Sequence, residues 1–198
     1  MDLFAALPSP ESERVALADA AYVLRAFAAA EAAALVEEIL RIAERAPFRN
    51  MITPGGRRMS VAMTNCGDAG WVTDSAGYRY QSTDPINAEP WPPMPQLFAV
   101  LATRAAERAG FDNFHPDACL INRYEPGARL TLHQDRDERD YEQPIVSVSL
   151  GLPCKFLFGG LERSDRVRRI RLEHGDVVVW GGVSRLTYHG VDTLADGS

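Results

Sequence analysis

Short runs of alternating apolar and polar residues fill the second half of the chain. Residues 144–150 alternate apolar side chains with small polar ones, which is typical of a half-buried β-strand. Pairs of turn-forming residues, such as Pro126-Gly127 and Gly159-Gly160, separate neighbouring runs. The other predicted strands are 117–124, 128–133, which returns after the turn at 126–127, 154–158, 167–172 and 176–180. Short strands at nearly even spacing indicate a sandwich or jelly roll.

The first half of the chain carries the helical patterns. Residues 28–45 repeat apolar side chains on one face, which predicts a helix, and Pro47 follows its end. Residues 96–109 predict a second helix, which Gly110 ends.

The stretch 47–95 between these helices is rich in glycine, proline, asparagine and threonine, with scattered aromatic residues. Within it only 57–64 alternates like a strand, and near the start of the chain 21–24 is a further short strand. A long irregular stretch in a compact domain is often functional.

These patterns predict an α+β protein that is mainly β, a double-stranded β-helix (jelly roll) with N-terminal helices. Residues 1–112 would hold the helices and the irregular stretch, and residues 113–198 the β-helix core, as one integrated domain. In such a fold a metal site lies inside one mouth of the double sheet.

Composition narrows the class of protein. With 198 residues, 46% hydrophobic and 24% charged, the chain suits one ordinary globular core. It begins without the basic and apolar run of a signal peptide, and no apolar run approaches the roughly 20 residues of a membrane span. Three cysteines without a C-x-x-C pair favour a reducing cytoplasm. We expect a cytoplasmic monomer that does not enter a membrane.

The net charge of −6 does not indicate a surface built generally for nucleic acid. Arginines nevertheless concentrate within residues 163–171. The simplest interpretation is that these arginines lie on the solvent-exposed face of a hairpin. The alternative is contact with phosphate, to which arginine makes bidentate hydrogen bonds.

A candidate metal site follows from two histidines and an aspartate. His133 and Asp135 are two residues apart, so on an extended strand they point to the same side. With His189 they could form the two-histidine, one-carboxylate triad of non-haem Fe(II) oxygenases, which leaves three metal positions open. H-x-D alone is a weak signal, and its setting among strands strengthens it. His115, before a proline, and His174, at a turn, are not expected to be ligands.

Several motifs together resemble the AlkB family of DNA-repair dioxygenases, over about residues 45–190. The motifs are Asn122-Arg123-Tyr124, 132–137 (LHQDRD), 173–182 (EHGDVVVWGG), 188–190 (YHG), 53–56 (TPGG), 59–66 (MSVAMTNC) and 116–122 (PDACLIN). They are far more specific than an isolated H-x-D, and they resemble bacterial members of the family most.

The resemblance implies a double-stranded β-helix that uses Fe(II), 2-oxoglutarate and O2 to remove alkyl groups from N-alkylated bases of DNA, single- or double-stranded, and also of RNA. Aldehyde, succinate and CO2 would be released. Its motifs imply the following roles. Iron ligands are His133, Asp135 and His189; 2-oxoglutarate contacts are Leu120, Asn122 and Tyr124; aromatic residues of a nucleotide-recognition lid are Trp71 and Tyr78; residues around the flipped base are Met63, Asp137 and Arg163.

Each implied role has a plainer alternative. Trp71 could belong to an ordinary core, but its glycine-rich neighbours favour base stacking, with His133 on the other side of the slot. Asp137 could face solvent or pair with an arginine. It would point to the metal side only if the strand that carries His133 continues.

The family carries an R-x-N-x-T-F-R type strand, whose arginines bind 2-oxoglutarate, after the second histidine. Nothing in this chain matches that motif, so we expect the C-terminal strand to be missing and 2-oxoglutarate to bind weakly, unless an arginine already present, such as Arg123 or Arg185, supplies the contact. Two alternative functions therefore stay open. One is an Fe/2-oxoglutarate oxygenase of another substrate; the other is an inactive nucleic-acid-binding fragment.

Overall fold

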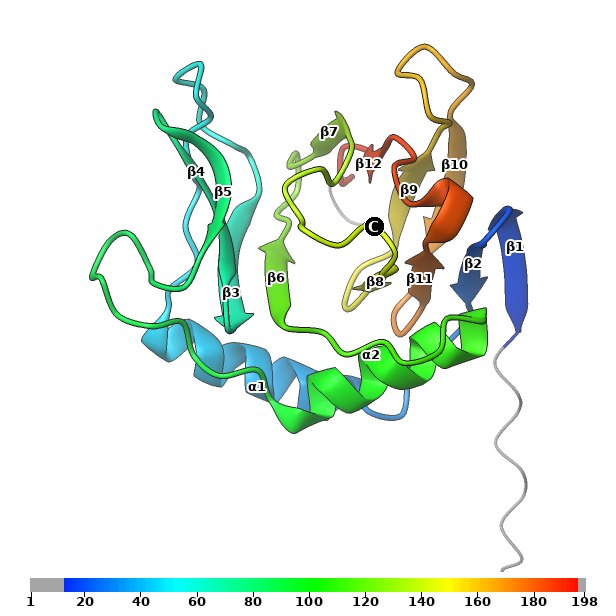
Figure 1. Cartoon of the computed structure of the whole chain (residues 1–198), viewed down its shortest axis with the longest axis horizontal. Coiled ribbons are helices and arrows are strands. Elements are labelled where there is room, and N and C mark those ends of the chain that lie inside the picture. Colours follow the sequence, from blue (N-terminus) through cyan, green and yellow to red (C-terminus); the bar gives the residue numbers. More distant parts are fainter. Residues whose placement is uncertain (1–12, 196–198) are drawn as a thin grey trace, which may run out of the picture.

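A computed structural model describes residues 13–195 of the chain. Two four-stranded antiparallel sheets and two helices form the main body (Figure 1). The first sheet has the order β1-β2-β11-β8 and the second has the order β10-β9-β12-β7. In the first sheet the strands are β1 (Arg14–Ala18), β2 (Ala21–Leu24), β8 (Ile145–Val148) and β11 (Val177–Trp180). In the second they are β7 (Leu130–His133), β9 (Cys154–Phe158), β10 (Arg168–Leu172) and β12 (His189–Val191). The predicted double-stranded β-helix is confirmed.

Strand β11 shows that the first sheet lies between the second sheet and the helices. All four of its residues are buried, which is typical of a strand covered on both faces. Val178 and Trp180 pack toward Phe156 and Phe158 of the second sheet. Val177 and Val179 face the helices instead. The β-helix therefore has one core between its sheets and a second core under the helices.

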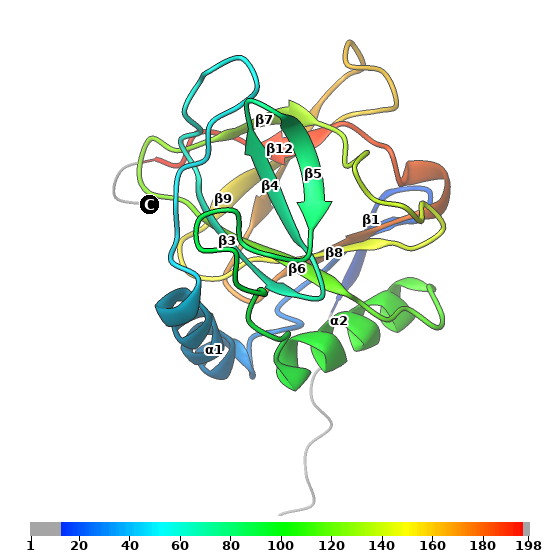
Figure 2. The same ribbon diagram turned by 60° about the vertical axis from the view of Figure 1, so that its left-hand side comes forward.

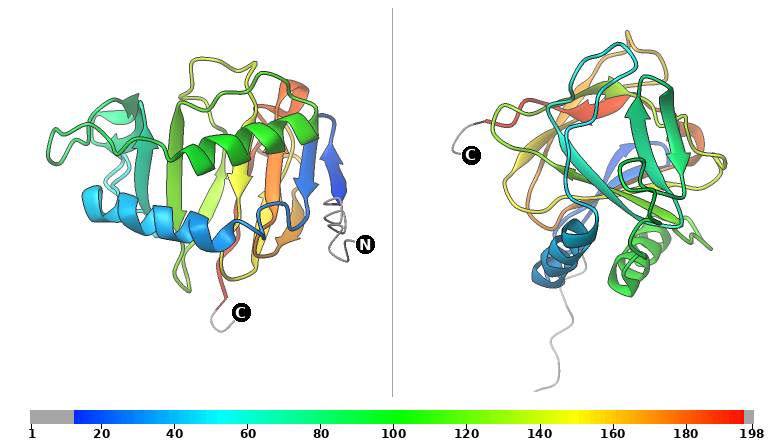
Figure 3. Two further views of the ribbon diagram at one scale, coloured as in Figure 1. Left: turned by 90° about the horizontal axis from the view of Figure 1, so that it is seen from below. Right: turned by 90° about the vertical axis from the view of Figure 1, so that its left-hand side faces the viewer.

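Both helices cover the same side of the first sheet, as the views of Figure 3 show. Helix α1 (Ala32–Arg45) contributes Leu35, and helix α2 (Gln96–Ala109) contributes Leu101 and Ala105 to the core beneath them. The prediction for α2 is confirmed, and Gly110 ends it with a left-handed φ of 94°. Among residues 13–195, neither helix is long and apolar enough to cross a membrane.

The first helix begins later than predicted. Residues 28–31 form turns, in which the backbone N–H groups of Ala29 and Ala32 donate to carbonyls three residues earlier, and the N–H of Ala28 ties the segment to the carbonyl of Gly175 at 2.8 Å. Local periodicity cannot anticipate that long-range bond.

The stretch 47–95 is more regular than predicted. It contains strand β3 (Ala62–Gly67), which is later than the predicted 57–64, and a hairpin of β4 (Gly70–Asp74) and β5 (Gly77–Gln81). Figure 2 brings this hairpin toward the viewer. Trp71 therefore lies on a strand, not in an irregular loop.

Strands β6 (Ala118–Arg123) and β7 were predicted to return on each other, and that prediction is wrong. Strand β6 pairs with β3, whereas β7 pairs with β12. The turn at 126–127 therefore transfers the chain from one sheet to another. It brings residues after β6 next to the strand that carries His189.

Gly190 allows β12 to approach β7 closely. A Cβ atom there would lie 2.5 Å from the carbonyl oxygen of Leu130, closer than real Cβ contacts. We expect Gly190→Ala to lower the free energy of unfolding by roughly 1–3 kcal/mol. Chemical denaturation would measure it, with Gly55→Ala as control, since nothing lies within 4 Å of a Cβ at Gly55. Equal stability of the two variants would contradict this account of the β7–β12 contact.

Candidate metal centre and its lid

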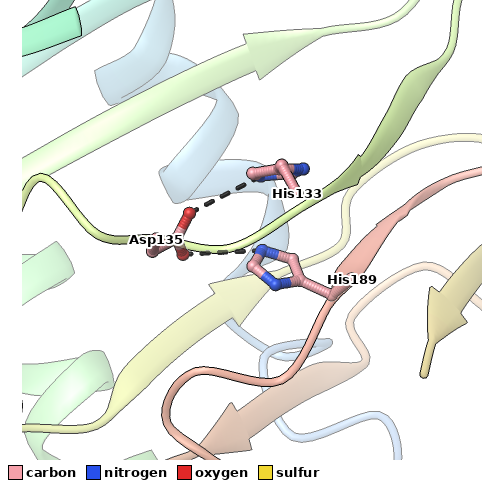
Figure 4. A group of neighbouring side chains, drawn as sticks. All are labelled: His133, Asp135 and His189. Carbon is pink, nitrogen blue, oxygen red and sulfur yellow. Dashed lines mark ion pairs between the residues drawn. The ribbon is translucent and has the colours of Figure 1, made fainter. Parts of the chain in front are cut away.

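Three side chains, two from neighbouring strands and one from the segment that follows the first of them, meet at the mouth of the β-helix (Figure 4). His133 ends β7 and His189 begins β12, and the two residues are direct partners in the antiparallel ladder. The Nε2 atoms of His133 and His189 each lie 3.5 Å from an oxygen of Asp135. Among residues 13–195, these side chains form the one group of three or more metal-ligating residues with ligand atoms within 4.8 Å of one another.

Asp135 reaches this position differently from the prediction. Strand β7 ends at His133, so the two-residue alternation of a strand does not direct the carboxylate. The segment after β7 turns it back between the histidines. Gln134 holds that turn, since its Nε2 donates to the carbonyl of Leu186 at 2.5 Å. The same turn means that Asp137 does not continue the strand.

Backbone carbonyls orient both imidazoles. The Nδ1 atoms of His133 and His189 lie 2.9 Å and 3.0 Å from the carbonyl oxygens of Thr131 and Thr187. Nδ1 must carry the proton that it donates there, so in the neutral ring Nε2 has the lone pair that a metal needs, whereas in the protonated ring Nε2 can donate to Asp135. Metal-ligating histidines typically have such an arrangement. The donor set therefore fits a divalent transition metal of the Fe(II) kind.

The surroundings of the two histidines shift their pKa values in opposite directions. Burial lowers the pKa of His189 to about 4; the charge of Asp135 opposes this shift, and the nearby His133 contributes to it. Trp180, with its ring centroid 4.7 Å from that of His189, forms part of the apolar surroundings. Burial also opposes protonation of His133, but the hydrogen bond and charge of Asp135 outweigh it and raise the pKa.

The Asp135 carboxyl group shows the reverse balance. Burial favours its neutral form, but the hydrogen bond from His133 and the charges of His189, His133 and Arg185 lower its pKa below the ordinary value. A carboxylate ionised at neutral pH is the form that a metal needs.

The predicted 2-oxoglutarate contacts lie on and just beyond β6. Leu120 and Tyr124 pack in one cluster with Met63, Trp71 and Leu130. Asn122 is opposite Met63 in the β3–β6 ladder, and its Oδ1 is buried with no hydrogen-bond partner within residues 13–195. Because the two ends of an amide are assigned only from their partners, this unpaired end can serve as donor or acceptor. Such a buried polar group is suited to a ligand that supplies the missing bond.

The predicted lid residues lie on the β4–β5 hairpin. Trp71 and Tyr78 stack with ring centroids 5.7 Å apart and planes 20° apart, and Tyr78 is half exposed. The indole Nε1 of Trp71 donates to Asp137 Oδ2 at 2.7 Å. Asp137 thus pairs with the lid rather than with an arginine. These contacts set the orientation of the indole beside the metal site.

Arg163 reaches the same region from the β9–β10 connection. Its Nη1 donates to the carbonyl of Leu132, next to His133, at 2.8 Å, and its guanidinium lies 5.8 Å from the centre of the Tyr188 ring. Of the neighbouring arginines, Arg169 pairs with Asp192 and Arg171 with Glu173. Part of the arginine cluster is therefore neutralised on the outer face of β10.

Other residues join the site that the sequence motifs did not single out. Tyr80 and Glu138 form a hydrogen bond between the lid and the segment after Asp135, and Arg185 is buried behind that segment. The one sequence signal for Tyr80 is its two-residue spacing from Tyr78, which places both on one face of the hairpin. Arg185 had been considered for 2-oxoglutarate, but its guanidinium contacts Glu138 and backbone carbonyls.

A jelly roll with two histidines and one carboxylate at its mouth defines the class of non-haem iron oxygenases. A model described as the 2OG-Fe(II) oxygenase superfamily matches residues 20–198. The chain belongs to this superfamily, and within it to the AlkB family.

The AlkB relationship rests on close relatives. The chain is 57% identical to "Alpha-ketoglutarate-dependent dioxygenase AlkB" of Escherichia coli (strain K12) over 197 residues, which cover 100% of this chain and 90% of the relative. It is 59% identical over 181 residues to the AlkB dioxygenase of Salmonella typhimurium, covering 91% and 84%. A solved structure, "The structure of OsALKBH1", is similar with a TM-score of 0.81 and 27% identity, covering 91% of this chain and 88% of that one.

Proposed function

We propose that this protein removes alkyl groups oxidatively from N-alkylated bases in DNA, and also in RNA, in the direct repair of alkylation damage. Fe(II), 2-oxoglutarate and O2 are the cofactor and cosubstrates, and aldehyde, succinate and CO2 are the products. The observation that carries the proposal is the metal triad with a stacked aromatic hairpin bonded to the segment beside it. Relatives named nucleic acid dioxygenase and tRNA demethylase support a nucleic acid substrate.

The triad residues have one task each in this proposal. His133 and His189 offer Nε2, and Asp135 offers a carboxylate oxygen, so three ligands come from one side. A metal held by these three residues would keep its remaining positions for cosubstrates. Bound Fe(II) and 2-oxoglutarate would supply the O2-dependent oxidation of a C–H bond. The hydroxylated N-alkyl carbon then leaves as an aldehyde and restores the base.

The residues on β6 would hold 2-oxoglutarate. Asn122 offers the unpaired end of its amide, and Tyr124 offers a hydroxyl that stays protonated because burial raises its pKa. Leu120 would pack against the apolar part of the cosubstrate.

The hairpin would receive the damaged base. The alkylated atom lies on the Watson–Crick edge, so the base must be extruded or already single-stranded. Trp71 and Tyr78 offer aromatic surface, Met63 packs with Trp71, and Arg163 is bonded to the carbonyl of Leu132 next to the ligand His133. A cationic base over such a ring gains on the order of 0.5–2 kcal/mol. Asp137, which Trp71 holds in place, would add preference for positively charged lesions.

Metal affinity should depend on pH through His133. Its raised pKa means that it is the first ligand to take up a proton as the pH falls. A protonated imidazole cannot ligate, so log K should fall by about one for each pH unit below that pKa. His189, with a pKa of about 4, and Asp135, with its lowered pKa, keep their ligating forms over that range. Titration with Co(II) between about pH 5 and 8 measures the slope; a flat line or a slope near two would contradict the assignment.

The proposal also covers location, oligomeric state and strand type: the protein is a cytoplasmic monomer, and it accepts single- and double-stranded alkylated DNA. The three free cysteines support a reducing compartment. Size-exclusion chromatography with light scattering tests the monomer, and parallel assays on both strand types test the substrate.

Turnover with a methylated oligonucleotide tests the function. An oligonucleotide carrying 1-methyladenine or 3-methylcytosine, with Fe(II) and 2-oxoglutarate, should give aldehyde and succinate in equal amounts. Unmethylated oligonucleotide is the control. Succinate release that ignores methylation would indicate an oxygenase of another substrate. Oligonucleotide binding without succinate would indicate a nucleic-acid-binding protein without this activity.

A further inference from the structure

The β4–β5 hairpin is fastened at two points to the segment that follows Asp135. Trp71 and Tyr80 are direct partners across the hairpin, so they lie side by side. The Nε1 of Trp71 donates to Asp137, and the hydroxyl of Tyr80 donates to Glu138 Oε1 at 3.0 Å. Two adjacent donors of the hairpin thus meet two consecutive carboxylates, which begin two residues after a metal ligand.

Arg185 continues this connection into the metal site. Its side chain is only 3% exposed, and its Nη2 lies 3.3 Å from Glu138 Oε2. Its Nη1 donates to the backbone carbonyl of Asp135 at 3.1 Å, and its Nε donates to the carbonyl of Gln143 at 3.0 Å. One planar guanidinium therefore holds both ends of residues 135–143 and the carboxylate that receives the Tyr80 bond.

The side chains that form this connection make it rigid. Arginine offers its donors in a fixed fork, so Glu138 and the Asp135 carbonyl cannot move independently. A buried guanidinium without its carboxylate would be poorly compensated, which keeps Glu138 in place. Burial and the charge of Glu138 also raise the pKa of Tyr80, so its hydroxyl remains a donor. The hairpin and the metal ligand are thus connected by the Tyr80–Glu138 hydrogen bond, the Glu138–Arg185 ion pair and the hydrogen bond from Arg185 to the Asp135 carbonyl.

We propose that Tyr80, Glu138 and Arg185 are positioning residues that couple closure of the β4–β5 hairpin to the geometry of the metal site. The proposal rests on the proposed function, in which the hairpin covers the base and the triad holds the metal. A metal that draws Asp135 into place also sets Glu138 as the acceptor for Tyr80 and steadies the hairpin. By thermodynamic linkage, a closed hairpin raises metal affinity by the same factor. Damaged base and metal would therefore assist each other's binding.

The test uses the metal-free full chain and Co(II) as the probe. Tyr80→Phe removes one hydroxyl and keeps the ring, and Tyr22→Phe, on β2 among residues under the helices, is the matched control. Hydrogen exchange of the amides in 70–81 is followed with and without Co(II), and Co(II) affinity is measured by titration. In the wild type, Co(II) should slow exchange of the hairpin by about fivefold or more.

Tyr80→Phe should lose that slowing and bind Co(II) about fivefold more weakly, whereas Tyr22→Phe should behave as the wild type. Arg185→Lys, which keeps the charge and loses the fork, should weaken Co(II) binding by about tenfold. If Arg185→Lys does not fold, Tyr80→Phe alone decides.

Equal slowing of hairpin exchange by Co(II) in the wild type and in Tyr80→Phe would overturn the proposal, since the Tyr80 bond would then be structural only. Hairpin exchange that Co(II) leaves unchanged in the wild type would overturn it as well. The exchange and Co(II) measurements test the coupling without any turnover, so the coupling and the enzyme activity are tested separately. Coupled exchange without turnover of methylated oligonucleotide would overturn the proposed function alone.

Discussion

Replacing Asp135 with alanine is expected to abolish stoichiometric binding of Fe(II), and of Co(II) or Mn(II) as inert substitutes. Asp135 is the one carboxylate of the triad, and it lies 3.5 Å from both imidazole Nε2 atoms. Without it, two neutral imidazoles would have to hold a dication with no negative ligand. The loss should exceed the roughly 10–100-fold that removal of an outer-shell partner costs. Metal analysis after desalting, together with titration, would measure it.

Asp140→Ala is the matched control for this experiment. Asp140 lies on the same segment and is exposed, and within residues 13–195 its carboxylate accepts only the backbone N–H of Glu142. The Asp140→Ala variant loses the same negative charge, but at the surface, and it should bind metal as the wild type does. Full Fe or Co occupancy in Asp135→Ala would show that the triad is not the metal site.

The second large effect is expected at Trp71. Stacking of a base on an aromatic side chain contributes about 1–3 kcal/mol. Trp71→Ala should therefore weaken binding of a 1-methyladenine or 3-methylcytosine oligonucleotide by roughly tenfold or more. Trp71 is not a member of the metal triad, so Co(II) should still bind stoichiometrically. Fluorescence anisotropy of a labelled oligonucleotide, with Co(II) bound, measures the change.

Trp71→Phe separates the two roles of the indole. It keeps an aromatic ring for stacking and removes the Nε1 donor to Asp137. Its affinity for the methylated oligonucleotide should fall between the wild type and Trp71→Ala. Unchanged affinity in Trp71→Ala would show that the hairpin is not the base-recognition lid.

The sequence by itself determined the elements whose pattern is local. Residues 154–158 and 177–180 form strands where apolar runs predicted them, because a strand is set by the side-chain pattern of a few consecutive residues. Helix α2 ends at Gly110 because only glycine adopts a left-handed φ at low cost there. The metal triad was also predictable, since its residues carry their chemistry wherever the chain places them.

Tertiary structure alone decided which segments pair. Strand β2 lies beside β11, far away in the sequence, and β6 pairs with β3 instead of with β7. The β4–β5 hairpin formed in a stretch without clear alternation, because contacts with the rest of the chain outweigh weak local preference.

The details of the site were likewise decided by the fold. Asp135 lies beyond the end of its strand, and the turn at Gln134 aims it at the histidines. Tyr80, Glu138 and Arg185 meet although the residues are up to 105 positions apart, which no spacing within the sequence encodes. Residue type set what each side chain can do, and long-range backbone pairing decided which side chains do it together.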